Sequence, residues 1–320
     1  MGSANVDAPS DPNLRNFRDL SVRISVEKAA KSSNGDEDRP PSRRTKSVLV
    51  VGECKRYGSR LMSSHILERF KLNGRTALVT GAGQGIGEAL VHALAQAGAR
   101  VAVVDVNGAN AEKVAKAIKS YHKEVIAVNC DIRFPEQVAA MVHRVTDYFG
   151  GLHIAFNNAG INRNSAAEET ELSEWDETFA VNLRGLFICC QEEGKVMLAA
   201  GYGKIINTAS MSSIIVPHPQ KQAAYNVSKA GVVNLTRSLA AEWANRGVRV
   251  NCISPGILRT KLIMESPALA PLVEGWIRDV PMGRLCELED LTGAAVYLAS
   301  EVSDYMTGHN LIIEGGTTLW

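Results

Sequence analysis

The residues Thr76-Ala-Leu-Val-Thr80 run directly into Gly81-Ala-Gly-Gln-Gly-Ile-Gly87, and a helix-forming stretch follows from Glu88. The first segment is apolar or β-branched, which is typical of a buried strand. Glycines in the turn let the backbone approach a pyrophosphate, and the N–H groups and positive dipole at the helix start attract its charge. The spacing is not the usual G-x-G-x-x-G, but the order strand, glycine turn, helix predicts a dinucleotide site.

From Leu72 onward, short apolar runs alternate with helical stretches, as βαβ units require. The predicted strands are Thr76–Thr80, Arg100–Asp105, Val125–Asn129, His153–Asn157, Lys204–Thr208, Arg249–Ile253 and Asn310–Ile313. The predicted amphipathic helices are Glu88–Ala97, Ala111–Ser120, Pro135–Phe149 and Tyr225–Asn245. This pattern predicts an α/β fold over residues 71–320, a doubly wound (Rossmann), mostly parallel seven-stranded sheet with helices on both faces, in a single domain.

Residues 1–70 have a different composition. Every residue from Lys31 to Lys46 is polar, charged, Pro or Gly, which cannot bury enough surface to offset chain entropy. The apolar run Val48–Val51 precedes a glycine, but the Gly-Lys-Ser/Thr of a phosphate-binding loop does not follow it. We therefore expect a disordered or irregular N-terminal extension.

The overall composition excludes several classes of partner. The formal net charge is only +1 and no basic stripe with interleaved aromatic residues occurs, so we expect no nucleic-acid partner. No apolar run approaches the roughly 18–20 residues that cross a bilayer, so we expect no membrane association. The six cysteines form no C-x-x-C pair and lack histidines at metal-ligand spacing, which predicts reduced thiols and no metal site. This usage favours a cytoplasmic location and leaves import into an organelle open.

The second predicted strand ends at Asp105, eighteen residues beyond Gly87. A dinucleotide site needs a carboxylate there to hold the adenosine ribose hydroxyls, although an ordinary polar strand end would look the same. The carboxylate would repel a 2′-phosphate. Neither Gln84 in the glycine turn nor Val106 and Asn107 offers a cation to bind that phosphate, so we predict NAD and regard NADP as the alternative.

Tyr225 and Lys229 are four residues apart in Y-N-V-S-K, so they share one side of a helix. A phenol has a pKa of about 10, and a nearby ammonium and a cationic nicotinamide ring would lower it. Tyr225 could then exchange the proton of an alcohol, while Ser210 at a strand end hydrogen-bonds the reacting oxygen. A Y-x-x-x-K pair alone is common on protein surfaces, and only its place after this serine makes it specific.

Together these motifs resemble the short-chain dehydrogenase/reductase family, from Leu72 to the C-terminus. They are, in the family's order, T-G-A-G-Q-G-I-G, N-N-A-G (157–160), the Asn182 of V-N-L-R-G, Ser210, Tyr225-x-x-x-Lys229 and Pro255-Gly256. The resemblance implies that Asn182 completes the catalytic set by holding a water that relays protons to Lys229, which also binds the nicotinamide ribose. The implied cofactor contacts are Gly81, Gln84, Gly85, Ile86, Gly87, Asp105, Asp131 (to adenine), Asn158 (beside the adenine ribose), Tyr225, Lys229, Ile257 and Thr260 (to the carboxamide).

One departure concerns the serine. Ser210 precedes Tyr225 by fifteen residues, slightly more than is common in the family. Ser212 and Ser213 are therefore alternatives for its role. We favour Ser210 because it ends the strand at the family's position.

The sequence around Ser210 and Tyr225 resembles that of fungal-type polyol and ketose reductases, the sorbose reductase and arabinitol dehydrogenase group. His218 and Gln220, together with Gln222, could hydrogen-bond substrate hydroxyls, or they could be exposed loop residues. Residues 262–284, which include several large apolar side chains, are predicted to form a lid over the substrate.

These observations favour an NAD-dependent oxidoreductase that interconverts a secondary alcohol and a ketone, most simply a polyol and a ketose. The alternative within the family is a 3-oxoacyl or hydroxysteroid-type reductase, which a wholly apolar lid would favour. A non-catalytic, cofactor-binding partner protein is a remote alternative, because the catalytic set is intact. The resemblance also implies a homo-oligomer, typically a tetramer packed through the helices after Asn182 and from Tyr225.

Overall fold

The computed structural model describes residues 65–319. The predicted irregular extension over residues 1–70 therefore lies almost wholly outside the described part of the chain. Within that part, Ile66–Phe70 form a short 3-10 helix, and the Arg69 guanidinium donates a hydrogen bond to the main-chain oxygen of Glu301 at 3.3 Å. Residues 66–70, which were predicted to belong to the irregular extension, are therefore helical in the described part of the chain.

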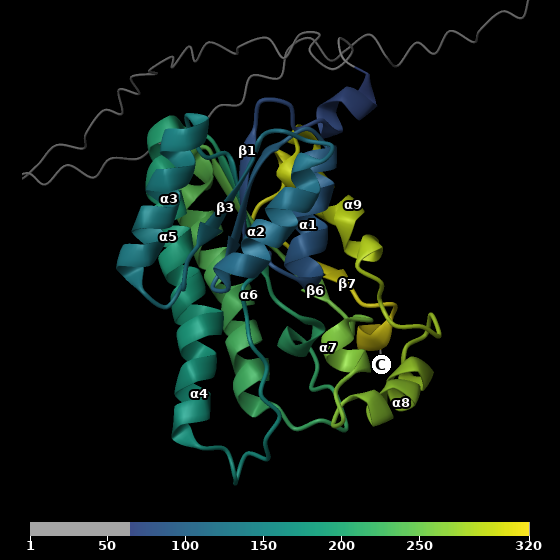
Figure 1. The fold of residues 1–320 in the computed structure, drawn as a ribbon. Coiled ribbons are helices and arrows are strands. Elements are labelled where there is room, and N and C mark those ends of the chain that lie inside the picture. Colours follow the sequence, from purple (N-terminus) through teal and green to yellow (C-terminus); the bar gives the residue numbers. More distant parts are fainter. Residues whose placement is uncertain (1–64, 320) are drawn as a thin grey trace, which may run out of the picture. The chain divides into compact units, whose positions relative to one another are not determined.

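The seven strands form one sheet in the order β3-β2-β1-β4-β5-β6-β7, and every neighbouring pair is parallel (Figure 1). They are β1 (Thr76–Thr80), β2 (Arg100–Asp105), β3 (Val125–Asn129), β4 (Ile154–Asn157), β5 (Gly203–Thr208), β6 (Val248–Pro255) and β7 (Asn310–Ile313). The predicted doubly wound α/β fold is confirmed. The strand order reverses between β1 and β4, and ligands of such sheets bind beyond the carboxyl ends of the strands at that reversal.

Helices cover both faces of the sheet. They are α1 (Gly85–Gln96), α2 (Gly108–Lys119), α3 (Pro135–Phe149), α4 (Leu172–Phe179), α5 (Leu186–Ala200), α6 (Ala223–Trp243), α7 (Lys261–Met264), α8 (Val273–Asp279) and α9 (Glu289–Ala299). Side chains of α3, α5 and α6 build the core on one face, and those of α1, α2 and α9 build it on the other. None of the helices in residues 65–319 combines the length and the apolar character that a bilayer crossing needs.

The predicted boundaries differ from the observed ones by up to three residues. The largest differences are at the starts of α1 and α2, where the helix begins at a glycine. α1 begins at Gly85 rather than Glu88, and α2 begins at Gly108 because the Asn107 side chain accepts a hydrogen bond from the Asn110 N–H and caps it. The last turn predicted for α6 is a separate 3-10 helix, Ala244–Arg246. No bounds were predicted for α4, for α5 or for the π-helix between them.

A carboxyl group is buried in the core between the sheet and α5. Glu193 is fully buried, and one of its oxygens accepts a hydrogen bond from the Asn157 amide at 2.9 Å. The same amide reaches the side-chain oxygen of Asn207 at 3.2 Å, and Asn207 donates to the Thr236 hydroxyl at 3.0 Å. Burial raises the pKa of Glu193 to about 8, which favours the neutral acid at neutral pH.

Replacing Glu193 with Gln should raise the melting temperature at pH 8 but hardly at pH 4. An unfolded glutamate ionises at a pKa of about 4.3. Because the folded pKa is about 8, the stability that this group contributes is lost as the pH rises between the two values. The difference in melting temperature between Glu193→Gln and the natural chain should therefore widen over that pH range. Each kcal/mol of unfolding free energy corresponds to about 2–4 °C. Glu112→Gln, on the exposed side of α2, is the control, and a gap independent of pH would contradict the assignment.

Candidate active site

The glycine turn between β1 and α1 brings backbone into close contact with backbone. Gly81 has a φ of +62°, and a Cβ on Gly87 would overlap the Gly81 carbonyl oxygen. Gly85 has a φ of +58°, and no atom lies within 4 Å of the place where its Cβ would be. The exposed Gln84 precedes α1 without capping it through its side chain, so the N–H groups of the first turn, that of Ile86 included, are available to an anion. The turn fits a dinucleotide pyrophosphate.

Asp105 lies beside this turn, at the end of the neighbouring strand β2. Its carboxylate accepts hydrogen bonds from the main-chain N–H of Gly83 and of Asn107, each at 2.8 Å. These bonds fix the carboxylate at the place where the adenosine ribose of a dinucleotide would lie.

Two further predicted cofactor contacts have strong partners within the protein. The Asp131 carboxylate forms an ion pair with Arg133 at 2.6 Å, and hydrogen bonds from that guanidinium lower the pKa of Asp131. The Asn158 amide donates to the main-chain oxygens of Thr80 and Gly81, each at 3.2 Å. Asn158 therefore holds the glycine turn in place, and contacts of these two side chains with a cofactor stay predictions.

The geometry favours Ser210 over the two neighbouring serines. A hydrogen bond from the Ser210 side chain lowers the pKa of the Tyr225 phenol, and Ser210 Oγ accepts the main-chain N–H of Ser212 at 3.1 Å. The Ser212 hydroxyl instead accepts from Gln222 at 3.2 Å, and the Ser213 hydroxyl donates to the main-chain oxygen of Ser210 at 2.7 Å. Ser210 is thus the serine whose side chain meets the phenol.

Lys229 lies behind Tyr225 on the same side of α6. Its Nζ is 5.7 Å from the centre of the phenol ring and donates to the Thr208 main-chain oxygen at 2.7 Å. Burial lowers the pKa of Lys229 to about 8. Burial also raises the pKa of Tyr225, against the hydrogen bond from Ser210. The expected lowering of the Tyr225 pKa is therefore wrong for the protein groups alone, because desolvation of the phenol dominates.

Asn182 lies in the π-helix Ala180–Gly185, between α4 and α5, and is fully buried. Its Oδ1 accepts the Ile161 N–H at 2.8 Å, and its Nδ2 donates to the Ile161 oxygen at 2.9 Å and to Ser228 Oγ at 3.1 Å. A Cβ on Gly160 would lie 3.3 Å from Asn182 Oδ1 and 3.4 Å from Lys229 Nζ. Asn182 Oδ1 and Lys229 Nζ therefore both lie beside Gly160. An amide oxygen has two lone pairs, so Oδ1 could also accept a hydrogen bond from the predicted water.

Ile257 and Thr260 follow β6, at the same edge of the sheet. The main-chain oxygen of Ile257 accepts from the Cys286 N–H at 2.9 Å, and the Thr260 side chain caps α7. Their predicted contact with a nicotinamide carboxamide is compatible with this position and stays a prediction.

The predicted lid, residues 262–284, contains α7 and α8 and is not wholly apolar. Trp276 of α8 is buried, and its ring N–H donates to the main-chain oxygen of His218 at 3.2 Å and to Gln220 Oε1 at 3.1 Å. The His218 ring is mostly exposed, with Nε2 3.5 Å from the Asp279 carboxylate. Both predicted substrate residues therefore contact the lid, and their role toward substrate stays a prediction.

Asn162, which no sequence motif singled out, follows N-N-A-G-I and donates to Gln222 Oε1 at 3.1 Å. Its position directly after the family motif was the signal available from sequence. Within residues 65–319, no group of three or more His, Cys, Asp or Glu side chains is arranged to hold a metal ion.

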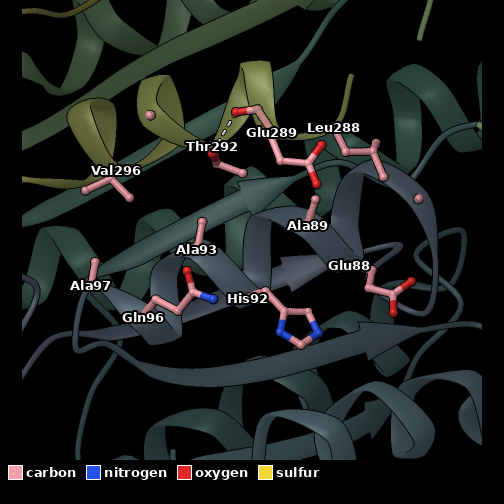
Figure 2. A pocket seen from close by; sticks show the side chains of 12 residues that line it. Glu88, Ala89, His92, Ala93, Gln96, Ala97, Leu288, Glu289, Thr292 and Val296 are labelled. Carbon is pink, nitrogen blue, oxygen red and sulfur yellow. Dashed lines mark hydrogen bonds between the residues drawn. The ribbon is translucent and has the colours of Figure 1, made fainter. Parts of the chain in front are cut away.

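A hollow of about 620 Å³ lies between α1 and α9, on the other face of the sheet from α6 (Figure 2). Ala89, Ala93 and Gln96 of α1 line it on one side, and Leu288, Glu289, Thr292 and Val296 line it on the other. Of the predicted site residues, only Gly85 lines this hollow. It therefore contains none of the catalytic set.

Comparison with known proteins identifies the family. The sequence model described as enoyl-(acyl carrier protein) reductase matches residues 81–318. D-threitol dehydrogenase of Mycolicibacterium smegmatis is 40% identical over 250 residues, 78% of this chain and 95% of that protein. This chain belongs to the short-chain dehydrogenase/reductase family. A probable NADP-dependent mannitol dehydrogenase of Yarrowia lipolytica is 38% identical, over 80% of this chain and 91% of the relative.

A solved short-chain dehydrogenase/reductase from Mycobacterium marinum has the same fold, with a TM-score of 0.77 and 40% identity over 79% of this chain and 99% of that one. Short-chain dehydrogenases/reductases are NAD(P)-dependent oxidoreductases, and the relatives named above act on CH–OH groups. The predicted family and the predicted enzyme class are confirmed.

Replacing Tyr225 with Phe should abolish turnover while dinucleotide binding stays nearly unchanged. The variant keeps the ring and loses only the proton carrier, and general acid–base groups contribute about 10²–10⁴-fold to rate. The rate of NAD(P)H formation and the dissociation constant of the dinucleotide, measured by fluorescence titration, check this separately. Activity within a few-fold of the natural chain would remove Tyr225 from its assigned role.

Proposed function

We propose that this protein is an NAD-dependent dehydrogenase that interconverts a secondary alcohol of a polyol and the corresponding ketose. The contact of Ser210 with Tyr225, with Lys229 behind the phenol, carries the proposal. The glycine turn and Asp105 would hold NAD, which would supply a hydride acceptor for the alcohol carbon, and Tyr225 Oη would take the hydroxyl proton. Ser210 would donate a hydrogen bond to the reacting oxygen, and the Lys229 ammonium would favour the phenolate.

Polar groups around the reacting hydroxyls support a polyol rather than an apolar substrate. Asn162, Ser212 and Gln222 form a hydrogen-bonded group next to Ser210, and Gln220 accepts the ring N–H of Trp276 in the lid. Gln222 is satisfied within this group, so discrimination would rest on Asn162 Oδ1, the Ser212 O–H and the Gln220 amide N–H groups, which an apolar ring or acyl chain would leave without partners. The names of the threitol and mannitol dehydrogenases support the same substrate class.

The position of Asp105 supports NAD as the cofactor. Its carboxylate is held against the glycine turn by two main-chain N–H groups, so a 2′-phosphate at the same ribose would meet a negative charge. Arg133 is paired with Asp131 and would have to break that ion pair to bind such a phosphate. The Yarrowia lipolytica relative is described as NADP-dependent, so the cofactor preference of this chain needs its own test.

A substrate panel tests the proposed reaction. NAD reduction should be measured with threitol, arabinitol, mannitol, sorbitol and xylitol, and with a steroid alcohol and a 3-hydroxyacyl thioester. At least one polyol should exceed both apolar substrates by about 100-fold in kcat/KM, because the polar groups near Ser210 discriminate by unpaired hydrogen bonds. Preference for the steroid or the thioester would instead support the alternative reductase class.

Replacing Asp105 with Ala should weaken NAD binding by at least about tenfold, the range expected for hydrogen bonds to a charged group. NADP binding should change little or improve, because the repelling carboxylate is gone. Dissociation constants of both dinucleotides, measured by calorimetry, check this, with Asp147→Ala on the exposed side of α3 as the control. Equal loss for both dinucleotides would contradict the choice of NAD.

A further inference from the structure

Gln222, the last residue before α6, has every hydrogen-bonding group of its side chain occupied. The side chain is 6% exposed. Its Oε1 accepts from Asn162 Nδ2 at 3.1 Å, and its Nε2 donates to Ser212 Oγ at 3.2 Å and to Asn226 Oδ1 at 2.8 Å. A primary amide has two N–H donors, and both are used. The amide plane is therefore fixed in one orientation.

These partners come from three separate segments. Asn162 follows the N-N-A-G motif after β4, Ser212 lies in the 3-10 turn Met211–Ser213 after β5, and Asn226 is beside Tyr225 on α6. A parallel main-chain bridge pairs Gln222 with Ser165 and strengthens the link to the first segment. One buried amide thus joins the loops that flank the phenol.

A continuous set of contacts leads from this amide to the reacting groups. Gln222 holds the Ser212 hydroxyl, and the main-chain N–H of Ser212 donates to Ser210 Oγ at 3.1 Å. Because Ser210 Oγ accepts that bond, its own hydrogen is directed away from Ser212 and is available to the phenol or the substrate oxygen. The Ser210 hydrogen bond lowers the pKa of Tyr225.

We infer that Gln222 is a positioning residue that, through Ser212, orients the Ser210 hydroxyl toward Tyr225 and the reacting oxygen. The inference rests on the proposed function, in which Ser210 and Tyr225 touch the substrate. It assigns to Gln222 an effect on the chemical step and on phenol ionisation. The same amide also holds Asn162, in the loop after β4, beside Gln222.

The test uses Gln222→Leu, Ser212→Ala and the double variant in the full-length protein. Both single variants should lose about 10- to 100-fold in kcat, as expected for a misplaced reacting group, while KM for NAD stays within about twofold. If Gln222 acts through Ser212, the double variant loses no more than the larger single loss. Gln96→Leu, exposed on α1 at the other face of the sheet, should leave kcat unchanged.

The ionisation of Tyr225 gives a readout that needs no substrate. Phenolate absorbance, taken as the difference between each protein and its Tyr225→Phe counterpart, should titrate at higher pH in Gln222→Leu and in Ser212→Ala. An unchanged titration with unchanged kcat would overturn the inference, and so would losses in kcat that add in the double variant. Circular dichroism checks folding, and Ser212→Ala carries the test if Gln222→Leu does not fold.

Failure of the proposed function would look different. A natural chain that oxidises none of the polyols would contradict that function, while the Tyr225 titration would still decide the role of Gln222. If the natural chain oxidises a polyol and Gln222→Leu has the same kcat and the same Tyr225 titration, only the role of Gln222 is contradicted.

Discussion

The first turn of α1 lies so close to the end of β1 that no side chain fits between Gly87 and the Gly81 carbonyl. This contact fixes the N-terminus of α1 at the point where the strand order reverses, so the helix dipole and its N–H groups meet the carboxyl edge of the sheet. Asn158 strengthens the contact by donating to both Thr80 and Gly81 from the neighbouring strand end. Asp105 is tied to the same turn, because its carboxylate accepts the main-chain N–H of Gly83.

Burial shifts the pKa values of Tyr225 and Lys229, the two groups proposed to handle the proton, in opposite directions. It raises the pKa of Tyr225 and lowers the pKa of Lys229, so the site disfavours charge on both. A phenolate therefore depends on hydrogen bonds from neutral donors and on the positive charge that a bound nicotinamide supplies. This dependence makes the orientation of Ser210 more important than the presence of the lysine alone would suggest.

The periodic parts of the fold were predictable from sequence because they rest on local rules. All seven strands were placed within about two residues, since buried parallel strands are short apolar runs between breakers. The catalytic residues were predicted from motif order and stay predictions, and the structure brings Ser210, Tyr225 and Lys229 together. The π-helix around Asn182 and the occupied amide of Asn158 were not predictable, because both depend on contacts between segments distant in sequence. For the same reason the burial that raises the pKa of Tyr225 cannot be read from the motif Y-x-x-x-K.

The hydrogen bonds around Gln222 also bear on how substrate preference can change during evolution. Asn162, Ser212 and Asn226 belong to three segments that would mutate independently, yet all three meet on one amide. Loss of any one of these side chains would leave the amide with an unmatched donor or acceptor. Changes in the three segments are therefore coupled through Gln222, whereas the lid is tied to the loop before α6 by the ring N–H of Trp276.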